Sequence, residues 1–165
     1  MSLRRFGFGK DWTTRRSSLR GLSLFAQSGF SKDRRVNWLA IVCAGAAYWI
    51  LGALWYSKLF SKPWVQAIER HGIKLQPSGM AMKLIVTFIA NLIAAIVLGR
   101  LFHQLGVKDV LRGVKIGAAV GVGFSATALT MNYVWQSPPP KLWAIDTSFH
   151  IVGCVLMGAI LSAWP

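Results

Sequence analysis

The sequence predicts an all-α fold, a bundle of four transmembrane helices preceded by a disordered basic N-terminal tail. The first observation behind this prediction is composition: of 165 residues, 54% are hydrophobic, and the mean hydropathy is +0.46. Such a chain is too apolar for a soluble domain of this length. The second is that the apolar residues gather in four runs. Each run is close to the ~20 residues that a helix needs to cross a hydrocarbon layer of ~30 Å.

The four runs divide the chain into two parts. Residues 36–165 are predicted to form the transmembrane domain, with spans at about 36–56, 84–102, 116–135 and 142–164, and residues 1–35 form the tail. Arg100 lies near the end of the second span, where its side chain can reach the headgroups. Between the first two spans, Ser61 before Pro63 is a helix-start signal and Gly72 a stop signal. A short helix over 62–71 is therefore expected, lying in the membrane interface.

Charge indicates the partners and the orientation. The chain has 19 Lys and Arg against 5 Asp and Glu, a net charge of +14. No motif that reads RNA or DNA accompanies this excess. We therefore expect the lipid bilayer as partner, with anionic lipid bound through the basic tail, and no nucleic acid. The N-terminal tail and the segment between spans two and three hold 13 basic residues, and the other side holds six. The positive-inside rule then places both termini in the cytoplasm.

The tail is rich in Arg and Ser, and its acids are Asp11 and Asp33. This composition is typical of a mitochondrial presequence. It also fits a basic arm on anionic lipid, or a start codon chosen too far upstream. The first interpretation places the protein in a mitochondrial membrane, and the other two in a bacterial inner membrane.

Stripes of small residues mark where helices are expected to pack. In lipid, helices associate chiefly where small side chains let their backbones approach closely. Two spans carry such residues at a spacing of four: Gly113, Gly117, Gly121 and Ser125 on the third, and Cys154, Gly158 and Ser162 on the fourth. These stripes predict a compact bundle or a homo-oligomer.

Extending the stripe of the fourth span backwards brings in His150 and Asp146. A carboxylate that faces hydrocarbon costs several kcal/mol, so both side chains are expected to face the bundle interior or to lie near the membrane interface. Counting at 1.5 Å per residue puts His150 about 12 Å from the outer end of its span. The other spans place polar residues at nearly that depth or slightly shallower, and the full candidate ligand-binding set is Tyr48, Asn91, Thr127, Asn132, Asp146 and His150.

Two interpretations of this polar layer are open. Asn, Thr and Tyr in membrane helices often only bond neighbouring helices. Asp146 and His150, one turn apart, could equally form a site that handles protons or a ligand. Histidine changes its charge near neutral pH, and a neighbouring carboxylate favours its charged form.

Other chemistries find no support in the sequence. Cys43 and Cys154 both lie in apolar runs and are expected to be packed thiols. Three histidines with one nearby acid are too few for a zinc site. His103 and His150 lie in opposite halves of the membrane, a poor arrangement for a haem. No nucleophile elbow, P-loop or dinucleotide motif occurs, so we expect no metal, no cofactor and no enzymatic activity.

The first span and its continuation resemble a known family. The stretch "VNWLAIVCAGAAYWILGALWYSKLFSKPW" is similar to the opening of the membrane proteins called domain of unknown function 1761. The resemblance covers roughly 36–164 and rests on Asn37, Trp38, Gly52, Ala53, Leu54, Trp55, Tyr56, Ser57, Phe60 and Trp64. Lys58 and Pro63 depart from the pattern. The resemblance implies a four-helix integral membrane protein and adds no activity.

The sequence thus predicts a multi-pass membrane protein that binds or translocates a small solute, ion or proton through its outer polar layer. With four spans, a transporter of this kind is expected to work as a dimer. The alternative is a structural or assembly subunit of a larger membrane complex, docked through its glycine faces.

Overall fold

The computed structural model describes residues 36–74 and 78–164, and throughout these ranges the regular structure is helical. The predictions made for the tail, residues 1–35, lie outside the described residues. Four helices are long and apolar enough to cross a membrane: Trp38–Leu59, Met80–Leu105, Val110–Gln136 and Pro140–Ala163. The predicted fold class, an all-α bundle of four membrane-spanning helices, is confirmed.

Two of the four spans contain π-helical turns. The first span is α2 (Trp38–Leu54) followed by the π-helical turn η1 (Trp55–Leu59), and the third is α5 (Val110–Val120), η2 (Gly121–Ala126) and α6 (Thr127–Gln136). The second and fourth spans are the single helices α4 (Met80–Leu105) and α7 (Pro140–Ala163). The short helix α3 (Ser61–Arg70) follows η1, within one residue of the range that the sequence predicts.

The helices extend past the predicted spans because local capping ends them, whereas hydropathy marks only their apolar part. Asp109 caps α5 by accepting a hydrogen bond from the backbone N–H of Arg112 at 2.8 Å. Gly79 and Gly106 bound α4 at φ values of 72° and 61°, a left-handed conformation that glycine adopts without a steric cost. Pro140 begins α7, where its missing N–H costs nothing.

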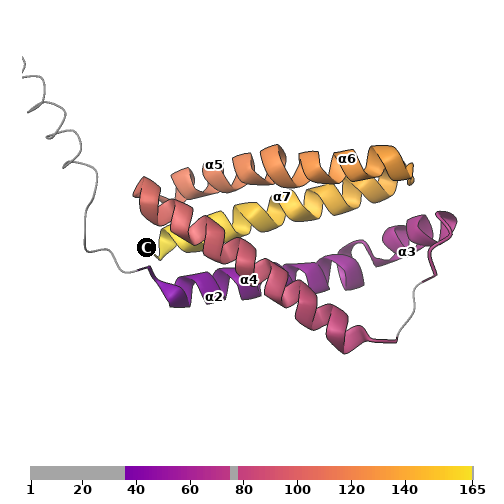
Figure 1. Ribbon diagram of the computed structural model, residues 1–165, viewed down its shortest axis with the longest axis horizontal. Coiled ribbons are helices and arrows are strands. Elements are labelled where there is room, and N and C mark those ends of the chain that lie inside the picture. Colours follow the sequence, from indigo (N-terminus) through magenta and orange to yellow (C-terminus); the bar gives the residue numbers. More distant parts are fainter. Residues whose placement is uncertain (1–35, 75–77, 165) are drawn as a thin grey trace, which may run out of the picture. The chain divides into compact units, whose positions relative to one another are not determined.

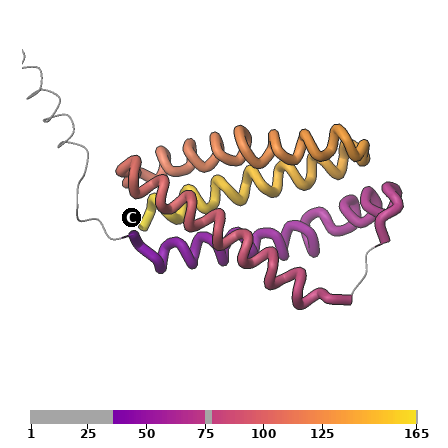
Figure 2. Tube along the Cα trace, in the orientation of Figure 1, coloured from indigo at the N-terminus to yellow at the C-terminus, as the bar shows by residue number. Residues whose placement is uncertain are grey.

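The described helices form two antiparallel pairs (Figures 1 and 2). The continuous rod of α5, η2 and α6 runs along α7, while α4 crosses α2 obliquely. The two ends of this bundle differ. One end holds α3 and the turn between α6 and α7, and we call it the α3 end; the start of α2 and the end of α7 lie at the opposite end. Towards the α3 end, α4 diverges from α7, and Met82 in that half of α4 is 65% exposed.

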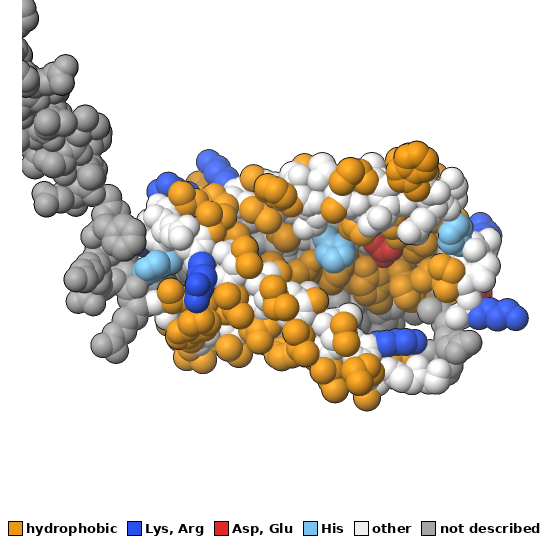
Figure 3. Space-filling view, viewed as in Figure 1, with side chains coloured by type: hydrophobic (Ala, Val, Ile, Leu, Met, Phe, Trp, Pro, Cys, Tyr) orange, Lys and Arg blue, Asp and Glu red, His pale blue; other side chains and the backbone are white. Residues whose placement is uncertain are grey.

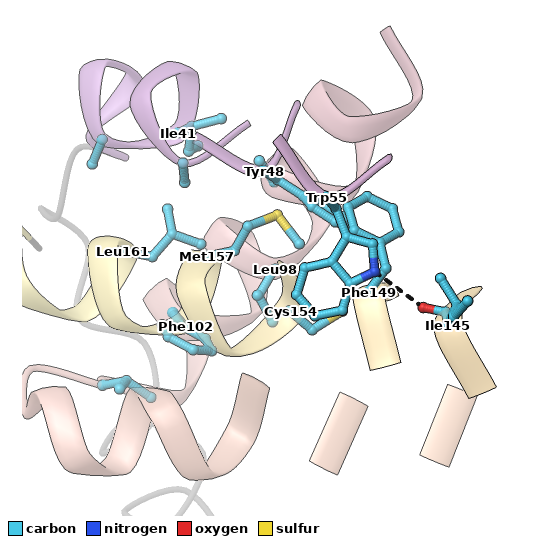
Figure 4. Close-up of a cluster of buried hydrophobic side chains, with 14 residues drawn as sticks. Ile41, Tyr48, Trp55, Leu98, Phe102, Ile145, Phe149, Cys154, Met157 and Leu161 are labelled. Atoms are coloured by element: carbon cyan, nitrogen blue, oxygen red, sulfur yellow. Dashed lines mark hydrogen bonds between the residues drawn. The ribbon is translucent and has the colours of Figure 1, made fainter. Parts of the chain in front are cut away.

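The hydrophobic core lies where α2, α4 and α7 meet. Figure 4 shows Ile41 and Tyr48 of α2 on one side, with Leu98 of α4 and Met157 and Leu161 of α7 beside them. Ile41 and Met157 are each 1% exposed. Small residues allow this approach: a Cβ on Gly99 of α4 would come within 2.8 Å of the Ile41 side chain.

The small-residue stripes of the third and fourth spans pack against each other within the same molecule. A Cβ on Gly117 would lie 2.4 Å from the carbonyl oxygen of Cys154, and one on Gly158 would lie 2.4 Å from the carbonyl oxygen of Gly113. Farther along, Ser125 Oγ and Cys154 Sγ are 3.8 Å apart. Because the obstructing atoms are backbone, only glycine fits these positions.

The turn η2 decides which face of α6 meets α7. A π turn holds about one residue more than an α turn, so the helix beyond it is rotated back by about 100°. In an unbroken α-helix, Tyr133 would lie about 120° around the axis from Gly121, which faces α7. With η2 between them the angle falls to about 20°. The widened turn therefore directs Tyr133 towards α7.

Candidate functional site

The carboxylate of Asp146 lies within the apolar helix α7 and accepts three hydrogen bonds. Its Oδ1 accepts from the Tyr56 hydroxyl at 2.9 Å and from the Trp64 indole N–H at 3.1 Å. Its Oδ2 accepts a hydrogen bond from the Tyr133 hydroxyl. All three donors are uncharged, so they solvate a carboxylate charge and do not cancel it. Asp146 is half-buried.

The three donors come from three different elements, η1, α3 and α6, and each reaches Asp146 for a local reason. Phe60 N–H bonds the carbonyl of Trp55 at 2.8 Å, which closes the π turn that carries Tyr56. After this turn the chain folds back as α3, and Ala67 and Ile68 are buried against Leu142 of α7. This packing holds Trp64 over α7, one turn before Ile68.

A second polar pair lies one helical turn from Asp146. The Tyr48 hydroxyl and His150 Nδ1 are 2.5 Å apart and share a hydrogen bond whose direction depends on the histidine tautomer. The ring of Tyr48 reaches His150 across Gly153, where a Cβ would come within 1.9 Å of it. Tyr48 is 3% exposed, whereas His150 is half-buried.

Aromatic rings surround both polar groups. The Tyr56 and Trp64 rings have centroids 4.9 Å apart and planes inclined by 56°. Phe149 lies between the two sites, with its centroid 5.2 Å from those of both Tyr48 and Tyr56. The Trp55 indole donates to the Ile145 carbonyl at 3.2 Å, which fixes η1 to α7 at this level (Figure 4).

The site has an open side. None of the residues of α6 (Thr127–Gln136) is buried, and α4 packs mainly on α2. The space-filling view shows acidic and histidine side chains among apolar ones on the face that carries α4 (Figure 3). A shallow open cleft of 380 Å³ lies on another side of α7, lined by Phe60, Pro63, Lys141, Ala144, Ile145 and Ser148, and neither Asp146 nor its three donors line it.

The structure joins only some of the six residues that the sequence singles out. Tyr48 bonds His150, and Asp146 lies one turn away on the same helix. Asn91 of α4 is half-buried, and no hydrogen bond links it to this pair. Thr127 is exposed, and its hydroxyl donates to the carbonyls of Gly123 and Phe124 in its own helix. Asn132 is exposed as well.

Sequence reasoning missed the three donors to Asp146. Tyr56 and Tyr133 lie near the ends of predicted spans, and Trp64 was expected in the membrane interface. The signal that could have found them is the acid itself: an intramembrane carboxylate requires donors, and tyrosine and tryptophan supply O–H and N–H groups from an apolar ring.

The arrangement can hold an anionic carboxylate in the membrane and present it to a positively charged partner. A carboxylate offers about four lone-pair positions, and three are used. In 36–74 and 78–164, no cluster of three or more His, Cys, Asp or Glu residues could hold a metal ion. The available chemistry is therefore binding of a proton or another cation at a single carboxylate.

Fold and site together define a class: multi-pass helical membrane proteins with a carboxylate held inside the bundle by aromatic donors. Over residues 39–162 the chain matches the family model described as "Protein of unknown function (DUF1761)", so it belongs to that family. The family resemblance seen in the sequence is thus confirmed. Comparison with curated proteins and with solved structures finds no match.

Proposed function

We propose that this membrane protein reversibly binds a small cation at Asp146, the proton being the simplest one. The observation that carries the proposal is the set of hydrogen bonds to this carboxylate. Its three bonded donors, Tyr56, Trp64 and Tyr133, are all neutral. A carboxylate charge in an apolar span is costly unless it is solvated and paired. Here it is solvated by its donors, and a bound cation would pair it.

The surroundings of Asp146 favour the binding of a ligand over a purely structural role for its hydrogen bonds. Asp146 and His150 are both half-buried rather than enclosed, so a solute can reach them. The Tyr48–His150 bond supplies a second group that can gain or lose a proton one turn away.

The alternative, an assembly subunit docked through its glycine faces, is less favoured, because several of these glycines pack within the chain. Gly113 and Gly117 pack against Gly158 and the backbone of Cys154 within the same chain. A partner protein would have to use another face.

The test is an infrared titration of the purified full-length chain in lipid nanodiscs. The C=O band of a protonated carboxylic acid should appear as the pH falls, with a component that is absent in Asp146→Asn and restored in Asp146→Glu. Asp109→Asn, which removes a carboxylate that caps α5, is the matched control and should keep this component. Circular dichroism checks that each variant is folded. If the folded Asp146→Asn protein titrates like the wild type, the proposed function is wrong.

A further inference from the structure

We propose that the cation is an organic ammonium ion with apolar substituents, which enters from the bilayer between α4 and α6. This inference rests on the proposed function of Asp146 and names the class of its ligand. Three features of the site carry it: the aromatic wall around the carboxylate, the lack of further hard ligands, and the apolar approach.

The wall consists of Tyr56, Trp64 and Phe149. Tyr56 and Trp64 both bond the carboxylate, and their centroids lie 4.9 Å apart with inclined planes. Phe149 continues the wall at 5.2 Å from Tyr56. A cation bound at the remaining lone-pair position of Asp146 would lie beside these rings. Indole and phenol faces attract weakly hydrated organic cations within about 6 Å of the ring.

A hard metal ion suits the site poorly. Ca²⁺ takes about six to eight oxygen ligands, and Mg²⁺ needs near-octahedral geometry. Asp146 is the carboxylate of this site, and the groups bonded to it are donors that direct hydrogen atoms at its oxygens. Within residues 36–74 and 78–164, no group of three or more His, Cys, Asp or Glu side chains is placed to hold a metal ion. An organic ammonium ion needs one anionic partner and apolar contact, which the site supplies.

The approach to the site is apolar. Side chains on the two flanking segments are exposed and hydrophobic, with Ile89 of α4 at 49% and Phe124 of η2 at 74%. An ion that carries apolar groups partitions into the bilayer and can follow such a surface, whereas a hydrated metal ion cannot. Lys141, the basic residue that lines the separate cleft on α7, is exposed near the helix end.

Benzyltrimethylammonium is the probe, added to the full-length protein in phosphatidylcholine nanodiscs at a pH where the Asp146 carboxyl band is half developed. Binding exchanges the carboxyl proton for the ammonium ion, and the released proton passes to water, where a pH dye reports it. Sodium chloride is the control for charge without a ring, and benzyl alcohol the control for a ring without charge. We expect proton release with the ammonium ion alone.

Variants locate the ligand. Trp64→Phe keeps the carboxylate and should weaken binding about three- to tenfold, because it removes the indole. Trp143→Phe is the matched control: this indole lies on α7 and bonds Thr130 Oγ1 at 3.0 Å, so binding should be unchanged. Lys141→Gln should also leave binding unchanged if the ligand sits at Asp146 rather than in the cleft.

The outcomes separate the two proposals. Equal proton release by sodium ions, or a carboxyl band that titrates but ignores the ammonium ion, would overturn the ligand class and leave the proposed function standing. Equal loss of affinity in Trp64→Phe and Trp143→Phe would also overturn the ligand class. If the wild-type protein shows no carboxyl band of Asp146 that changes with pH, the proposed function itself is wrong.

Discussion

Tyr48 of α2 lies directly against Gly153 of α7, so closely that a Cβ on Gly153 would stand 1.9 Å from Tyr48 Cε2. The hydroxyl at the far end of this ring shares the 2.5 Å hydrogen bond with His150. The missing side chain at position 153 is therefore what allows the hydrogen bond to form.

Gly153→Ala should push the Tyr48 ring away from α7 and lower the free energy of unfolding by about 1–3 kcal/mol, because the added methyl overfills a packed contact. Thermal unfolding of the purified protein in detergent measures this loss. Gly123→Ala is the control, since a Cβ there meets nothing within 4 Å, and its stability should stay level or rise slightly. Equal losses in the two variants would contradict the close contact.

Gly117→Ala should cost about 3 kcal/mol of stability, because its Cβ would meet the carbonyl oxygen of Cys154 at 2.4 Å and backbone cannot move aside. Gly52→Ala is the comparison: its Cβ would meet the ring of Phe149 at 3.1 Å, and a side chain can yield. We expect the Gly52 variant to lose much less in the same denaturation experiment. The prediction fails if both lose the same amount.

Tyr133→Phe and Asp146→Asn should be strongly coupled. Tyr133→Phe removes the donor of a charge-assisted hydrogen bond and Asp146→Asn removes the charge of its acceptor, so a double-mutant cycle should show a coupling energy of about 1–2 kcal/mol. Thr127→Val with Asp146→Asn is the control cycle, because the Thr127 hydroxyl bonds its own helix. That pair should be additive within about 0.5 kcal/mol. A larger coupling for Thr127 than for Tyr133 would contradict the site.

Asn37→Ala should destabilise the end of the bundle opposite α3 by about 1 kcal/mol. Its Oδ1 accepts from the Ala40 backbone N–H at 3.1 Å and caps α2, while its Nδ2 donates to the Trp164 carbonyl at 3.2 Å. Asn132→Ala is the matched control, because that side chain is exposed on α6. The loss should appear as a lower midpoint of thermal unfolding in the Asn37 variant alone.

Depth along a helix can be counted from sequence, and direction around its axis can be counted only where the helix is regular. Counting placed Tyr48 and His150 at the same level, and the structure joins them. It placed Thr127 at that level as well, yet Thr127 turns outward. Thr127 faces away from α7 with or without the widened turn η2. The turn instead redirects Asn132, which would lie about 20° around the axis from Gly121 in an unbroken α-helix and lies about 80° away with η2 between them.

The sequence by itself determined the four apolar helices, the short helix that follows the first span, and the small-residue stripes, because hydropathy, caps and spacing are local properties of the chain. Only the tertiary structure decided what surrounds Asp146. Its donors are Tyr56, Trp64 and Tyr133, which reach it because α3 folds back over α7 and η2 rotates α6. These are contacts between segments far apart in the chain, and the packing of whole helices fixes them.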